Sequence, residues 1–108
     1  MTAVEQLAVL ARLHDLFERQ GIAYWLFGGW AVDFHLRAVT RAHDDIDLAV
    51  WRRDLAAIAA LLEKDGWTSA VSGAEDGYTT YQRDDIQLDL AFLERDDDGA
   101  VYTPRTAR

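Results

Sequence analysis

The 108-residue sequence contains no cysteine, which excludes two ways of stabilising a small protein. A disulfide scaffold needs paired thiols, and many structural zinc sites are built from thiolates. Neither is available to this chain. Half of the residues are apolar, so a single domain of this length has enough material to bury a core.

Long apolar runs are also missing. The longest covers residues 22–32, is interrupted by Gly28 and Gly29, and is shorter than the roughly 20 residues that span a bilayer. The N-terminus carries Glu5 and no basic segment, so no secretory signal peptide is apparent. We therefore expect a cytoplasmic protein with no membrane partner.

Basic residues are scarce: 11 Lys and Arg stand against 19 Asp and Glu, for a net charge of −8. Proteins that bind long nucleic acids usually carry a basic surface, so the composition argues against such a partner. An acidic surface suits a partner that is small, bound through a metal, or cationic.

The spacing of apolar residues predicts alternating helices and strands. Predicted helices cover 4–20, 30–37 and 53–64, and predicted strands cover 22–27 (a buried strand), 45–50, 67–71, 78–82 and 86–93. This order predicts an α+β domain in which helices flank a mixed β-sheet. We place the domain at residues 1–95, and expect 96–108 to form a tail that begins with an acidic turn.

The most informative feature is a set of three carboxylates on two predicted strands. Asp45 and Asp47 lie two residues apart, so a strand points both the same way, roughly 6–7 Å apart at Cα. Such neighbours repel unless a cation lies between them, and Mg²⁺ prefers carboxylate oxygens. Asp89 has the matching position on a later strand. If these strands are neighbours, the three acids converge, and the small Ala49 and Ala91 leave space beside them.

The simpler alternative is a polar strand face in contact with water. For one acid alone we favour that alternative, whereas three acids on two alternating strands favour a metal site. Asp44 points to the opposite face, so it receives no metal role. Five further aspartates are typical turn residues: Asp84, Asp85 and 96–98.

A glycine pair joins a predicted strand to a predicted helix. Gly28 and Gly29 would let a phosphate approach the backbone at the N-terminus of that helix. The pair alone is weak evidence, since no Walker lysine and no later glycine of a dinucleotide fingerprint follows. Arg41, shortly before the acids, is either a ligand of a triphosphate or an exposed loop arginine.

The run from Gly28 to Asp33, followed by residues 40–48, resembles the antibiotic nucleotidyltransferases of the polymerase-beta-like superfamily. The likeness is to the aminoglycoside 2''-adenylyltransferase and lincosamide branch, and it covers about residues 25–93. Glycine-glycine-tryptophan together with His-Asp-Asp-Ile-Asp-Leu is a specific combination, although neither half is specific alone.

The resemblance implies particular roles. Asp45 and Asp47 would bind Mg²⁺, and Asp89 would be a further metal ligand or the general base. Gly28 and Gly29 would hold the triphosphate, next to Trp30 and Arg41. Gly29 stands where many superfamily members have a serine, so backbone donors would do more of the binding.

The implied reaction is transfer of a nucleoside monophosphate, AMP from ATP, to a hydroxyl of a small molecule. Two Mg²⁺ ions would assist, and an aminoglycoside-like or lincosamide-like antibiotic would be the acceptor. A cationic acceptor suits the acidic surface. Family analogy also favours a homodimer.

One departure from the family is that its largely helical C-terminal region has no counterpart here. The chain is then a truncation, a minimal protein, or half of a site that another subunit completes. This keeps a second hypothesis open: a non-catalytic nucleotidyltransferase-like module that pairs with a toxin or senses nucleotides. A third alternative is a structural domain whose acids face water, which predicts no stabilisation by Mg²⁺.

Overall fold

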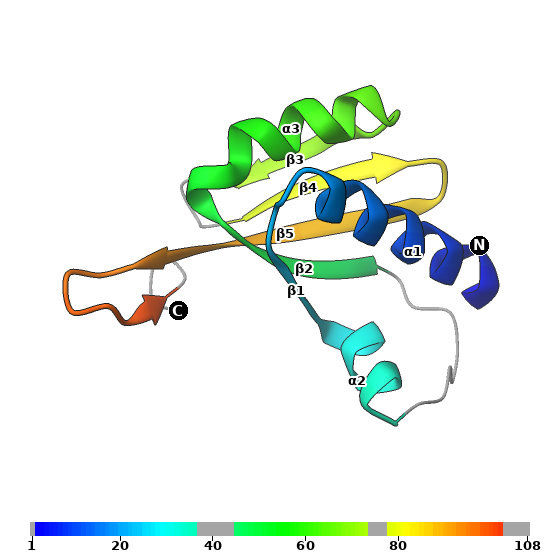
Figure 1. Ribbon diagram of the computed structural model, residues 1–108. Coiled ribbons are helices and arrows are strands. Elements are labelled where there is room, and N and C mark those ends of the chain that lie inside the picture. The colour runs from blue at the N-terminus through cyan, green and yellow to red at the C-terminus, as the bar shows by residue number, and fades with distance from the viewer. Residues whose placement is uncertain (1, 37–44, 74–77, 103–108) are drawn as a thin grey trace.

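A mixed β-sheet forms the centre of the protein (Figure 1), and the computed structural model describes residues 2–36, 45–73 and 78–102. Five strands follow the order β1-β2-β5-β4-β3, and a short β6 pairs with the end of β5. β2 and β5 are parallel, and the other pairs are antiparallel. The strands are β1 (Tyr24–Phe27), β2 (Asp45–Trp51), β3 (Thr68–Gly73), β4 (Tyr78–Arg83), β5 (Ile86–Arg95) and β6 (Val101–Tyr102).

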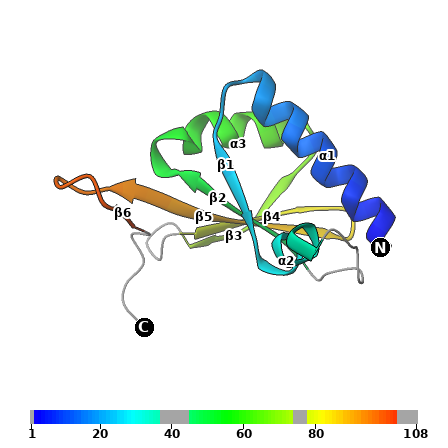
Figure 2. The ribbon, with the colours of Figure 1, turned by 60° about the horizontal axis from the view of Figure 1, so that its bottom comes forward.

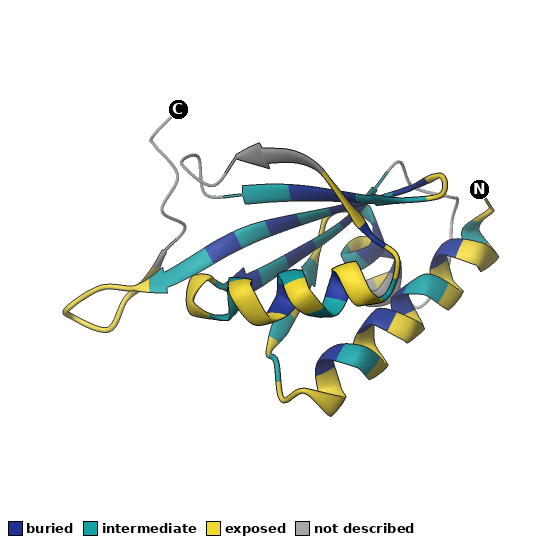
Figure 3. Ribbon diagram, turned by 90° about the horizontal axis from the view of Figure 1, so that it is seen from above, coloured by how far each residue is buried: buried dark blue, intermediate teal, exposed yellow. Residues whose placement is uncertain are grey.

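Two long helices cover one face of this sheet (Figures 2 and 3). α1 (Ala3–Arg19) begins at a capping box, in which the Glu5 amide donates to the Thr2 hydroxyl at 3.1 Å. α3 (Leu55–Lys64) follows β2 through a short 3-10 turn. A third helix, α2 (Gly28–Leu36), continues directly from β1. No helix among the described residues has both the length and the apolar character needed to cross a bilayer.

The core lies between the sheet and these two helices. Along β2 every second residue is buried, and the same alternation runs through most of β5, as expected for strands with one covered face. Burial of these side chains holds β2 and β5 in register, since a slip of one residue would turn them all to the other side. The buried apolar residues of these four elements are Leu10, Leu13, Phe17, Ile46, Leu48, Val50, Ile58, Leu62, Ile86, Leu88, Leu90 and Phe92.

One nearly buried carboxylate connects the two helices to the sheet. Asp65, at the end of α3, has a side chain that is 5% exposed. It accepts hydrogen bonds from Arg12 of α1 at 2.8 Å, from the Trp67 indole at 3.3 Å and from Arg83 of β4 at 3.4 Å. The bond from Arg12 is the largest cause that holds the pKa of Asp65 below its usual range. Through these contacts Asp65 links α1 and the end of α3 to each other and to β4.

The fold class and all predicted helices and strands are confirmed, with three corrections. β1 is not a buried strand, because it lies at the sheet edge and leaves Trp25 and Phe27 48% and 41% exposed. The glycine pair does not precede a helix but opens it, since α2 begins at Gly28. β6 was not predicted, although the acidic turn before it was: Asp96 accepts hydrogen bonds from the amides of Asp98 and Ala100.

Candidate metal centre

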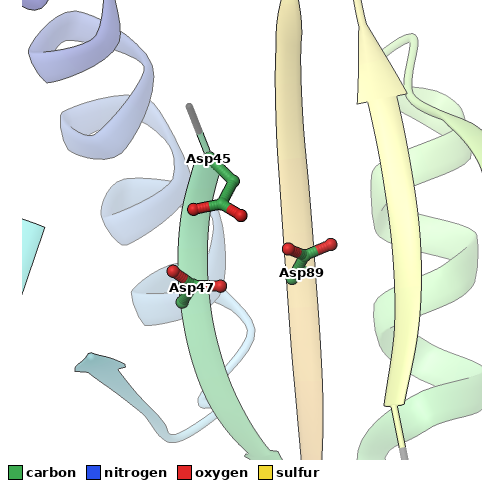
Figure 4. A group of neighbouring side chains, drawn as sticks. All are labelled: Asp45, Asp47 and Asp89. Atoms are coloured by element: carbon green, nitrogen blue, oxygen red, sulfur yellow. The ribbon is translucent and has the colours of Figure 1, made fainter. Parts of the chain in front are cut away.

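The three predicted acids lie together on the sheet face opposite α1 and α3, here called the open face. Parallel pairing sets Asp47 of β2 directly beside Asp89 of β5. Asp45 stands two residues before Asp47 on the same strand. Figure 4 shows the three carboxyl groups gathered at neighbouring positions of β2 and β5, and one oxygen from each lies within 4.8 Å of the others. The predicted convergence of the acids is therefore confirmed.

The electrostatics of Asp47 reflect this crowding. Burial raises its pKa to about 7, helped by the negative charge of Asp45 and then by that of Asp89. In the metal-free protein Asp47 is therefore partly protonated at neutral pH, whereas an isolated aspartate would be ionised. A divalent cation can replace that proton, because it neutralises the same charge. A set of partly exposed carboxylate oxygens matches the ligands that Mg²⁺ prefers.

Asp89 is held by two neutral donors that the sequence analysis missed. The Thr80 hydroxyl of β4 donates to its Oδ1 at 2.7 Å. The side-chain amide of Gln87 donates through Nε2 to Oδ1 and Oδ2 at 3.1 and 3.2 Å. A tight turn at Asp84-Asp85 would have placed Thr80 opposite Asp89, so the signal was present in the sequence.

Gly28 brings the start of α2 against the acids. Its φ of +73° is in the left-handed region, and a Cβ on Gly28 would overlap Oδ2 of Asp47. Both facts require glycine at this position. The N-terminus of a helix offers free amides and a positive dipole end, so the site pairs a place for a cation with a place for an anion.

The other predicted nucleotide ligands have different outcomes. Trp30 is fully buried in the core, so its indole packs there and only its backbone could face a ligand. Arg41 lies outside the described residues.

Known proteins are similar to this chain in sequence and in fold. Residues 9–105 match the family model described as aminoglycoside-2''-adenylyltransferase. The chain belongs to this family. The resemblance predicted from the glycine and aspartate motifs is therefore confirmed.

Two curated proteins are similar to this chain in sequence. The lincosamide resistance protein of Staphylococcus haemolyticus is 30% identical over 87 residues, which are 81% of this chain and 54% of that protein. A 2''-aminoglycoside nucleotidyltransferase of Escherichia coli is 37% identical over 60 residues, which are 53% of this chain and 34% of that protein.

Solved structures agree with the family. The solution structure of the antibiotic-resistance factor ANT(2'')-Ia superposes with a TM-score of 0.82 at 26% identity, and covers 93% of this chain and 52% of its own. Lincomycin-bound LnuA, a lincosamide antibiotic adenylyltransferase, gives 0.75 at 29% identity, and covers 85% of this chain and 58% of its own. The chain spans about half the length of the Staphylococcus haemolyticus protein, of ANT(2'')-Ia and of LnuA.

Replacement of Gly28 tests the close approach of α2 to Asp47. Gly21 is the matched control, because its φ is +67° and no atom lies within 4 Å of a Cβ built there. Gly21→Ala should cost about 1 kcal/mol of backbone strain and leave metal binding unchanged. Gly28→Ala should lower the melting temperature further and reduce the rise in melting temperature that Mg²⁺ produces. Equal melting temperatures and equal Mg²⁺ responses in the two variants would show that the approach is not close.

The raised pKa of Asp47 predicts how metal-free stability depends on pH. Between the unfolded value of 3.8 and the folded value of about 7, the folded protein binds more protons than the unfolded chain. Its free energy of unfolding should therefore fall as pH rises through this window. Urea unfolding in EDTA at several pH values measures the effect, and Asp47→Asn should flatten it. An unchanged pH profile in Asp47→Asn would contradict the assignment.

Proposed function

We propose that this protein is a metal-dependent nucleotidyltransferase that transfers AMP from ATP to a hydroxyl of a small antibiotic-like molecule. The observation that supports this most is the grouping of three carboxylates beside the glycine-led start of a helix. Carboxylates for a cation next to helix amides for phosphates form the arrangement that phosphoryl-group chemistry needs.

Each residue has a proposed role. Asp45 and Asp47 hold Mg²⁺, with Asp89 as a further ligand. The backbone amides of Gly28 and Gly29 bind the triphosphate, and Arg41 neutralises part of its charge. When bound, two Mg²⁺ ions would supply the positive charge that stabilises the crowded phosphate oxygens.

In the proposed reaction Asp89 has a second role, as the general base. The acceptor hydroxyl forms a bond to the α-phosphorus, and the bond to pyrophosphate breaks. The hydroxyl proton passes to Asp89, directly or through one water.

The relatives indicate the class of acceptor. One solved relative, ANT(2'')-Ia, is in complex with adenylyl-2''-tobramycin, and LnuA is bound to lincomycin. We propose an acceptor of the same kind, a sugar-bearing antibiotic. The net charge of −8 supports a cationic member of that class. The alternative of a non-catalytic module is not favoured, because these relatives are adenylyltransferases.

The test is transfer activity with ATP, Mg²⁺ and a panel that includes tobramycin and lincomycin. We expect pyrophosphate release together with an acceptor whose mass increases by one AMP group. Asp47→Asn and Asp89→Asn should each lower the rate by about 100-fold or more. Asp15→Asn is the matched control, because Asp15 forms an ion pair with Arg19 on the exposed surface of α1, and the substitution should leave the rate unchanged. ATP binding without pyrophosphate release, or normal turnover in Asp47→Asn, would contradict the proposal.

A further inference from the structure

Four polar side chains form a square on the open face. Asp45 and Asp47 of β2 pair with Gln87 and Asp89 of β5. The fourth corner is therefore a neutral amide and not another acid. Thr80 of β4 extends the row of Asp47 and Asp89 by one strand.

The two oxygens of Asp89 have different surroundings. Figure 4 shows one oxygen turned toward β2 and the other toward β4. The one on the β4 side, Oδ1, accepts the Thr80 hydroxyl at 2.7 Å and the Gln87 amide at 3.1 Å. The Gln87 amide reaches Oδ2 at 3.2 Å as well. These three hydrogen bonds define the rotation of the Asp89 carboxylate.

Thr80 is suited to this restraint. Thr80 is only 8% exposed. If its hydroxyl were removed, water could not easily replace that hydrogen bond to Asp89. A threonine also has a stiff χ1 because its Cβ is branched. The position of the hydroxyl is therefore set by the strand and not by solvent.

The hydrogen bonds from Thr80 and Gln87 to Asp89 oppose an electrostatic repulsion. Asp47 and Asp89 repel each other, so an untethered Asp89 would turn away from Asp47. A lysine or arginine could hold it in place, but its charge would also repel a cation in the site. The hydroxyl and the amide carry no net charge, so they hold the carboxylate without opposing the cation.

We propose that Thr80 and Gln87 are positioning residues, which hold one oxygen of Asp89 toward Asp47 so that the three carboxylates can share a divalent cation. The inference rests on the proposed metal role of these acids. Residues behind metal ligands that orient them typically change metal affinity or activity by about tenfold to 100-fold when removed.

The experiment compares Thr80→Val with Thr80→Ser. Valine keeps the shape and removes the hydroxyl, whereas serine keeps the hydroxyl. Thr68→Val, at an exposed position of β3, controls for the same exchange elsewhere in the sheet. The readouts are the Mg²⁺ dissociation constant by calorimetry, and kcat and KM for ATP.

Thr80→Val should weaken Mg²⁺ binding by about tenfold and lower kcat more than it raises KM. Thr80→Ser should restore most of the Mg²⁺ affinity, and Thr68→Val should match the wild type. If Thr80→Val does not fold, Gln87→Leu provides the same comparison, because it removes the other donor. Wild-type Mg²⁺ affinity and kcat in a folded Thr80→Val or Gln87→Leu variant would overturn the inference.

The same data separate this inference from the proposed function. A wild-type protein that binds Mg²⁺ but transfers no AMP contradicts the function, and a loss of Mg²⁺ affinity in Thr80→Val still supports the positioning role. An active wild type with an equally active Thr80→Val variant contradicts the positioning role and leaves the function standing.

Discussion

Repulsion among three carboxylates is the constraint on which this structure depends. Asp45, Asp47 and Asp89 lie close enough for one oxygen of each to fall within 4.8 Å of the others. They cannot move apart freely, because the alternate residues of β2 and β5 are buried under α1 and α3 and hold the two strands in register. The covered face thus maintains an unfavourable arrangement on the open face, where a cation would relieve it.

The surroundings of the three acids also favour the binding of a cation. Burial and neighbouring charge raise the pKa of Asp47 to about 7, so the metal-free site accepts a proton in place of a cation. Gly28 allows the start of α2 to reach Asp47, so the free amides of a helix N-terminus, which favour anions, lie beside carboxylates, which favour cations. Neutral donors from Thr80 and Gln87 hold Asp89. A cation and a phosphate chain could therefore be bound at one place, in agreement with a family of adenylyltransferases.

Strict alternation made the acids easy to predict from sequence. In the segments of Asp45 and Asp89, polar and apolar residues alternate so regularly that the shared face follows from strand geometry alone. Pairing between these two strands does not follow from periodicity, so the convergence of the acids was predicted only on the condition that the strands are neighbours. The exposure of Trp25 and Phe27 depends on which strand lies at the sheet edge, which local pattern does not reveal. The local pattern around Thr80 does not indicate its partner either, and only the turn at Asp84 and Asp85 places it opposite Asp89.

The most direct test is a crystal structure of the protein soaked with Mn²⁺ and a non-hydrolysable ATP analogue. Manganese takes the same oxygen ligands as magnesium and can be located by its anomalous scattering. The account predicts a peak within coordination distance of the Asp47 and Asp89 carboxylates, with the phosphates at the start of α2. A peak elsewhere, or an Asp89 carboxylate turned away from the ion, would contradict it.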